Sequence, residues 1–83
     1  MTKADDLRRG VDLAIAGDWD EAHEIAQRHE GDPTADWLHA VLHGIEGDAG
    51  NSRYWYRRCG KLDRAGSAAA TELAAIRESL ERG

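Results

Sequence analysis

The 83-residue sequence is poor in the features that mark secreted, disulfide-bonded or membrane-spanning proteins. It holds a single cysteine, which cannot form a disulfide within the chain and so favours a reducing compartment. No apolar run approaches the roughly 20 residues that a membrane-spanning helix needs. The first ten residues also lack the apolar segment of a secretory signal. We therefore expect a cytoplasmic protein.

Positive charge is scarce in the first part of the chain. Residues 1–52 carry a net charge of −8 and residues 53–83 carry +3, which gives the overall value of −5. Lysine and arginine supply most contacts to phosphate groups, so an acidic chain is poorly suited to nucleic acid or to anionic lipid. The charge distribution therefore predicts neither nucleic acid nor membrane as a partner.

Residues that favour β-strands are also rare. The chain has two valines and no phenylalanine, against fourteen alanines and seven leucines, and no segment alternates apolar and polar residues. Glycine, aspartate and proline divide it at short intervals, which predicts an all-α fold of about five helices in one domain, residues 1–83. We expect helices over residues 4–16, 19–30, 33–46, 51–59 and about 66–82.

Several of these boundaries have a local physical cause. Asp18 is expected to cap the second helix and to form a capping box with Glu21. Asp32 followed by Pro33 predicts a cap and a first helical position for the third. In the last helix an apolar stripe is expected to face the core, with Glu72 outside it; the stripe comprises Ala69, Leu73, Ile76 and Leu80.

An internal repeat appears when the chain is compared with itself at an offset of thirty residues. The offset pairs identical or similar residues, namely Val11 with Val41, Ile15 with Ile45, Gly17 with Gly47, Asp18 with Asp48 and Ala22 with Ser52. Repeated units of this size bury their apolar faces by stacking on neighbours. The pattern predicts two helix-turn-helix units, closed by the C-terminal helix.

The repeated residues resemble the turn and second helix of tetratricopeptide repeats, including those of small bacterial proteins. The resemblance covers about residues 4–59 and is carried by Gly17, Asp18, Trp19 and Ala22 in the first unit and by Gly47, Asp48, Ser52, Tyr56 and Cys59 in the second. It implies two stacked units with a C-terminal capping helix. It also implies an interaction module without chemistry of its own or a cofactor, which binds another protein or a second copy.

Two surfaces are candidates for that partner. The first is a groove between the first helices of the two units, with Trp37, Val41 and Ile45. The second is an aromatic and basic strip in the fourth helix, with Tyr54, Arg53 and Arg57.

A competing hypothesis is that histidines bind a metal or a small ligand, with or without catalysis. His39 and His43 are spaced i,i+4 on the third helix, and they are expected to face the second helix, which carries His23 and His29. Imidazoles at this spacing, with a carboxylate such as Glu46, suit a divalent transition metal. Because no established metal motif accompanies them, buried packing histidines are the alternative. The sequence leaves both open for the proposed ligand set, His23, His39, His43 and Glu46.

Overall fold

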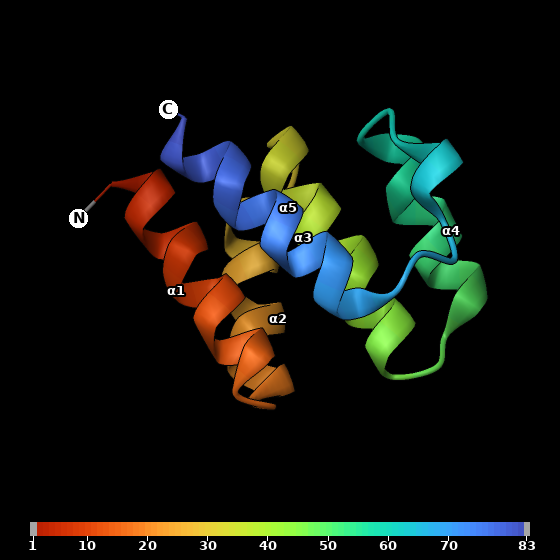
Figure 1. Cartoon of the computed structure of the whole chain (residues 1–83), viewed down its shortest axis with the longest axis horizontal. Helices are drawn as coiled ribbons and strands as arrows, with labels where there is room; N and C mark the ends of the chain where they lie inside the picture. Colours follow the sequence, from red (N-terminus) through yellow and green to blue (C-terminus); the bar gives the residue numbers. More distant parts are fainter. Residues whose placement is uncertain (1, 83) are drawn as a thin grey trace.

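The computed structural model describes residues 2–82, and within them every regular element is helical (Figure 1). The expected all-α fold of about five helices is therefore confirmed. The five α-helices and one short 3-10 helix are α1 (Lys3–Ile15), α2 (Trp19–Arg28), α3 (Pro33–Ile45), α4 (Ala49–Arg58), η1 (Leu62–Arg64) and α5 (Ala69–Glu81).

Most helix ends lie within two residues of the expected positions, and the exceptions have local causes. Asp32 caps α3 by accepting hydrogen bonds from two backbone amides, as expected. The expected capping box at Asp18 is wrong, because the Asp18 side chain makes no cap and Glu21 instead binds Arg9. The last helix begins three residues late, since Gly66 turns the chain at a φ of 89°.

The two turns paired by the thirty-residue offset have the same backbone. Gly17 and Gly47 adopt φ angles of 86° and 87°, and the following residues, Asp18 and Asp48, lie at φ −90° and −92°. In both turns the aspartate amide donates a hydrogen bond to the carbonyl five residues earlier. The two copies of the motif therefore share their local geometry.

Replacing Gly17 or Gly47 by alanine should destabilise the fold by about 1 kcal/mol, because a side chain is strained at positive φ. A Cβ would meet no other atom within 4 Å at either position, so the cost is purely conformational and should be similar at both. Urea unfolding of the two variants checks this prediction. A cost at only one position would contradict the equivalence of the turns.

Helix α3 lies at the centre of the fold and is buried on all sides. Every residue from 35 to 43 is buried, including the polar side chains of Asp36, His39 and His43. Helices α2, α4 and α5 all contact α3, so no side of it faces solvent over this stretch. A polar residue on α3 must therefore find its partners inside the protein.

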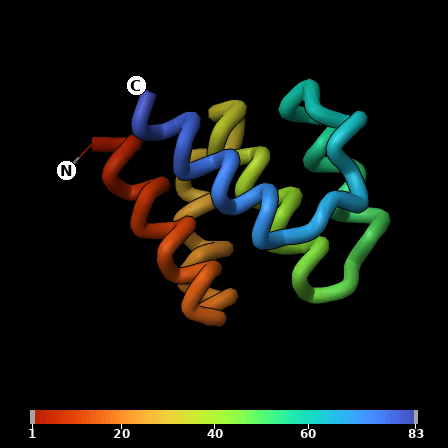
Figure 2. Tube along the Cα trace, viewed as in Figure 1, coloured from red at the N-terminus to blue at the C-terminus, as the bar shows by residue number. Residues whose placement is uncertain are grey.

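Helix α5 packs across α1 and α3 and does not simply close one end of the fold (Figures 1 and 2). This position corrects two expectations. Trp37 and Val41 were expected in a groove open to a partner, but only 5% and 3% of their surface is exposed, on a helix against which α5 packs. Glu72 was expected outside the apolar stripe of α5, yet it is 1% exposed.

Within the described residues, no helix combines the length and the apolar character needed to cross a lipid bilayer.

Candidate metal centre

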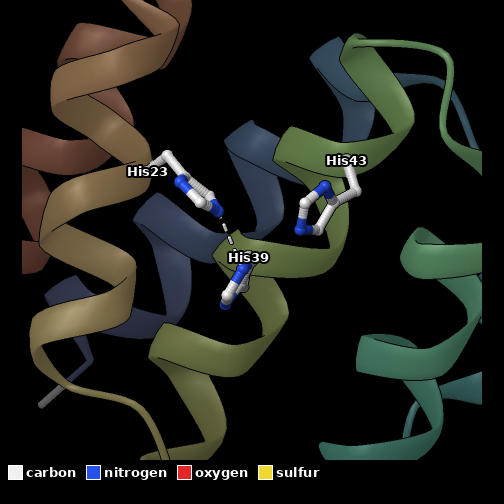
Figure 3. A group of neighbouring side chains, drawn as sticks. All are labelled: His23, His39 and His43. Atoms are coloured by element: carbon white, nitrogen blue, oxygen red, sulfur yellow. Dashed lines mark hydrogen bonds between the residues drawn. The ribbon is translucent and has the colours of Figure 1, made fainter.

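Three histidines from two helices converge on one point (Figure 3). His23 projects from α2 and is partly buried, whereas His39 and His43 project from successive turns of α3 and are buried. One ring nitrogen from each lies within 4.8 Å of the other two. The Nε2 atoms of His23 and His39 are 3.0 Å apart, at hydrogen-bond distance. The structure therefore brings together three of the four residues of the predicted ligand set, His23, His39 and His43.

Two tryptophans hold the histidine rings in place. The His23 ring stacks on Trp19 with 4.5 Å between ring centroids, and the His39 ring stacks on Trp55 at 3.9 Å. Trp19 is itself fixed, since its Nε1–H donates to the carbonyl of Leu42 at 2.6 Å. Because such stacking restricts the torsions of each ring, the imidazoles are oriented before any ligand arrives.

The surroundings favour the uncharged form of His23 and His39 near neutral pH. Burial, together with repulsion from His23, His43 and Arg58, lowers the pKa of His39 to about 4. Burial, with repulsion from His43, also lowers the pKa of His23. Neutral imidazole is the form that has a lone pair for a metal ion.

The low pKa of His39 predicts a loss of stability in acid. Between pH 6.5, the ordinary pKa of histidine, and about 4, His39 is protonated in the unfolded chain but not in the folded protein. Unfolding is therefore favoured as the pH falls through this window, by up to about 3 kcal/mol from this residue.

Urea unfolding at pH 7, 5.5 and 4.5 measures that loss. His39→Leu is the control, because other groups also titrate and this variant removes only the histidine. The decline should be smaller in the variant, and an identical decline in both proteins would contradict the prediction.

One nitrogen of His39 has no partner. Its Nδ1 is buried and makes no hydrogen bond to any described residue. Buried polar atoms without partners are rare in folded proteins, and they often mark a functional site. This atom therefore costs free energy in the folded protein.

Glu46 lies near the cluster but on the far side of the His43 ring. Its Oε2 is 2.8 Å from the Nδ1 of His43, whose Nε2 points toward the other two histidines (Figure 3). Glu46 and Asp48 also form, with His43, a second group whose ligand atoms lie within 4.8 Å of one another. Both carboxylates of this group are exposed.

The remaining candidate residues lie elsewhere. His29 pairs with Asp6 at 2.8 Å and does not join the cluster. Ile45, the last residue of α3, is 44% exposed. Tyr54 is 46% exposed, so this part of the aromatic strip on α4 faces solvent. The exposed residues Arg53 and Arg57 flank Tyr54 on α4 and make no ion pair among the described residues.

Sequence reasoning missed how the aromatic residues serve this cluster. Nothing in the spacing of Trp55 along the chain shows that its ring stacks on His39, which lies on another helix. The pairing follows from the antiparallel packing of α3 and α4, a long-range contact that no local pattern encodes.

Three imidazoles arranged in this way can bind a divalent transition metal. In a tetrahedral zinc shell, ligand nitrogens at about 2.0 to 2.1 Å from the ion are separated by about 3.3 Å. The 3.0 Å between His23 and His39 is close to that value, and His43 lies near enough to complete a set of three. One coordination position would remain for water or for another ligand.

No protein-family model, curated protein or solved structure significantly matches this chain.

Proposed function

We propose that this protein binds a divalent transition metal ion through His23, His39 and His43. The observation that carries the proposal is the convergence of three imidazole ring nitrogens within 4.8 Å of one another inside a packed, aromatic-lined junction of α2, α3 and α4. Packing alone does not require three imidazoles at this junction, since apolar side chains would fill the same space without burying polar atoms.

The donor set favours a particular class of ion. Imidazole is a ligand of intermediate softness, preferred by Zn²⁺, Cu²⁺, Ni²⁺ and Co²⁺, whereas Mg²⁺ and Ca²⁺ prefer oxygen. No described carboxylate shares the meeting point of the three histidines. The site should therefore discriminate strongly against the alkaline-earth ions.

Thermal unfolding with and without zinc tests the proposal. An ion that binds only the folded protein stabilises it and so raises the melting temperature. The stabilisation is about 2.7 kcal/mol when the free ion is at one hundred times its dissociation constant. Copper gives a second readout, because an open-shell ion at this site should quench the fluorescence of the stacked residues Trp19 and Trp55.

The matched control is His29→Ala, which also removes one histidine but leaves the cluster intact. It should respond to zinc like the parent protein, whereas His23→Ala should not. If zinc leaves the melting temperature unchanged, or if both variants lose the response equally, the proposal is wrong.

A second candidate function is binding to another protein or to a second copy, favoured by the exposed side chain of Tyr54 between two arginines without ion pairs. The tetratricopeptide resemblance supports it, and the acidic α2 of another copy offers a partner of complementary charge. Sedimentation velocity at low and high salt tests self-association, since such contacts weaken as salt screens the charges.

A half-buried, unpaired Cys59 supports our further proposal that the protein works in the cytoplasm.

A further inference from the structure

The ring of His43 offers a metal ion two alternative places. Its Nε2 side faces His23 and His39, and its Nδ1 side faces Glu46 and Asp48 (Figure 3). Both groups have ligand atoms within 4.8 Å of one another, so proximity alone does not choose between them. Which side of the His43 ring binds the ion determines the role of Glu46, and the inference below rests on the metal site proposed above.

We propose that Glu46 is a positioning residue that holds His43 in the tautomer needed to bind the ion through Nε2. An ionised carboxylate can only accept a hydrogen bond, so at 2.8 Å the Nδ1 of His43 must carry the hydrogen. The lone pair of the ring is then on Nε2, which points at the other two histidines. Carboxylates that bind the second nitrogen of a metal-bound histidine commonly set its tautomer and orientation in this way.

The alternative site on the Nδ1 side is poorly suited to an ion. Glu46 already accepts from His43 there, and Asp48 uses both carboxylate oxygens to cap α4 through the backbone amide and the side-chain amide of Asn51. An ion at this place would compete with these hydrogen bonds for the carboxylate oxygens. Both acids are also exposed to solvent, where water competes for the ion.

The backbone itself gives Glu46 no structural duty. At the equivalent place in the first turn stands Ala16, and the two residues have nearly the same φ and ψ, −74° and −7° against −78° and −2°. Each donates its backbone amide to the carbonyl four residues earlier. The same turn therefore forms with alanine, and Glu46→Ala should fold normally.

The test combines the imidazole nitrogen NMR spectrum of the metal-free protein with zinc affinities of variants. In the parent protein, His43 should show its hydrogen on Nδ1. In Glu46→Ala the Nε2–H form should become prominent, and zinc affinity should fall by about 10- to 100-fold. Glu46→Gln should lie between, because its amide oxygen still accepts from Nδ1–H.

Asp48→Asn is the control that separates the two sides of the ring. It keeps a side-chain oxygen for the cap of α4 but removes the carboxylate, and it should bind zinc like the parent. A loss of affinity in Asp48→Asn as large as that in Glu46→Ala would place the ion on the carboxylate side and overturn the inference.

Failure of the inference can be told apart from failure of the metal site. If the parent protein binds zinc but Glu46→Ala keeps both its affinity and its tautomer, the positioning role is wrong and the metal site stands. If the parent protein does not bind zinc, the proposed function is wrong, and the tautomer of metal-free His43 still tests what Glu46 does.

Discussion

Replacing Glu72 by alanine is expected to destabilise the protein by about 3 kcal/mol, because it removes a buried carboxylate and leaves its hydrogen-bond donors without their acceptor. The carboxylate accepts hydrogen bonds from Trp37 at 3.2 Å, from Tyr56 at 2.9 Å and from Arg64 through three contacts of 2.7 to 3.1 Å. These bonds join α5 to α3, α4 and η1. A domain of this size has a total stability of about 5 to 15 kcal/mol, so the loss should be large.

The electrostatics of the pair agree with this expectation. Burial raises the pKa of Glu72, but the hydrogen bonds from Arg64, Trp37 and Tyr56 outweigh it and hold the pKa below the ordinary value. The charged form is therefore the one that the fold stabilises. Burial and the neighbouring Glu72 carboxylate also raise the pKa of Tyr56, which remains a hydrogen-bond donor.

Urea unfolding measures the effect, with Glu78→Ala as the matched control on the same helix. Glu78 is exposed, and its one ion pair among residues 2–82 is with Arg82 at 2.5 Å, so its removal should change stability by less than about 0.5 kcal/mol. Equal unfolding midpoints for the two variants would show that the buried network contributes nothing beyond a surface pair.

Replacing His39 by leucine is expected to move stability and metal binding in opposite directions. Leucine removes the buried Nδ1 that has no partner, which should stabilise the metal-free protein by about 1 kcal/mol. It also removes one of three ligands, and zinc affinity should fall at least 100-fold. Function that costs stability in this way is common at binding sites.

Calorimetric titration with zinc and urea unfolding without metal together check the prediction. Loss of the stacking contact between His39 and Trp55 works against the gain in stability, so His29→Leu serves to calibrate a histidine replacement outside the cluster. A variant that loses stability and keeps its zinc affinity would identify His39 as a packing residue only.

Local patterns predicted much of the fold because helix ends depend on neighbouring residues. Asp32 and Pro33 start α3 where they should, and the glycines at the paired turns adopt the positive φ that only glycine adopts easily. The packing of α5 was not predictable in the same way. Its apolar stripe fits any apolar surface, and whether it covers the end of the fold or the groove over α1 and α3 depends on long-range contacts.

The burial of Glu72 is the clearest example of a feature that local sequence patterns do not predict. On sequence alone a glutamate beside an apolar stripe is expected in solvent. Here it is buried because Arg64, Tyr56 and Trp37, which come from three other elements, all supply donors to it. No spacing rule joins residues so far apart.

The candidate site was partly visible in the sequence. The i,i+4 spacing of His39 and His43 placed them on one side of a helix, and the repeat register turned that side toward His23. The role of Glu46 was predicted as that of a ligand, whereas its carboxylate contacts the outer nitrogen of His43. That difference depends on side-chain torsions, which the sequence does not specify.

X-ray absorption spectroscopy of the zinc-loaded protein would show whether three histidines bind one transition metal ion. We expect one equivalent of zinc, with three imidazole nitrogens at about 2.0 to 2.1 Å and a fourth light ligand. The same sample of His23→Ala should lose that signature. A shell made mostly of oxygen, or a protein that retains no zinc after desalting, would contradict the claim.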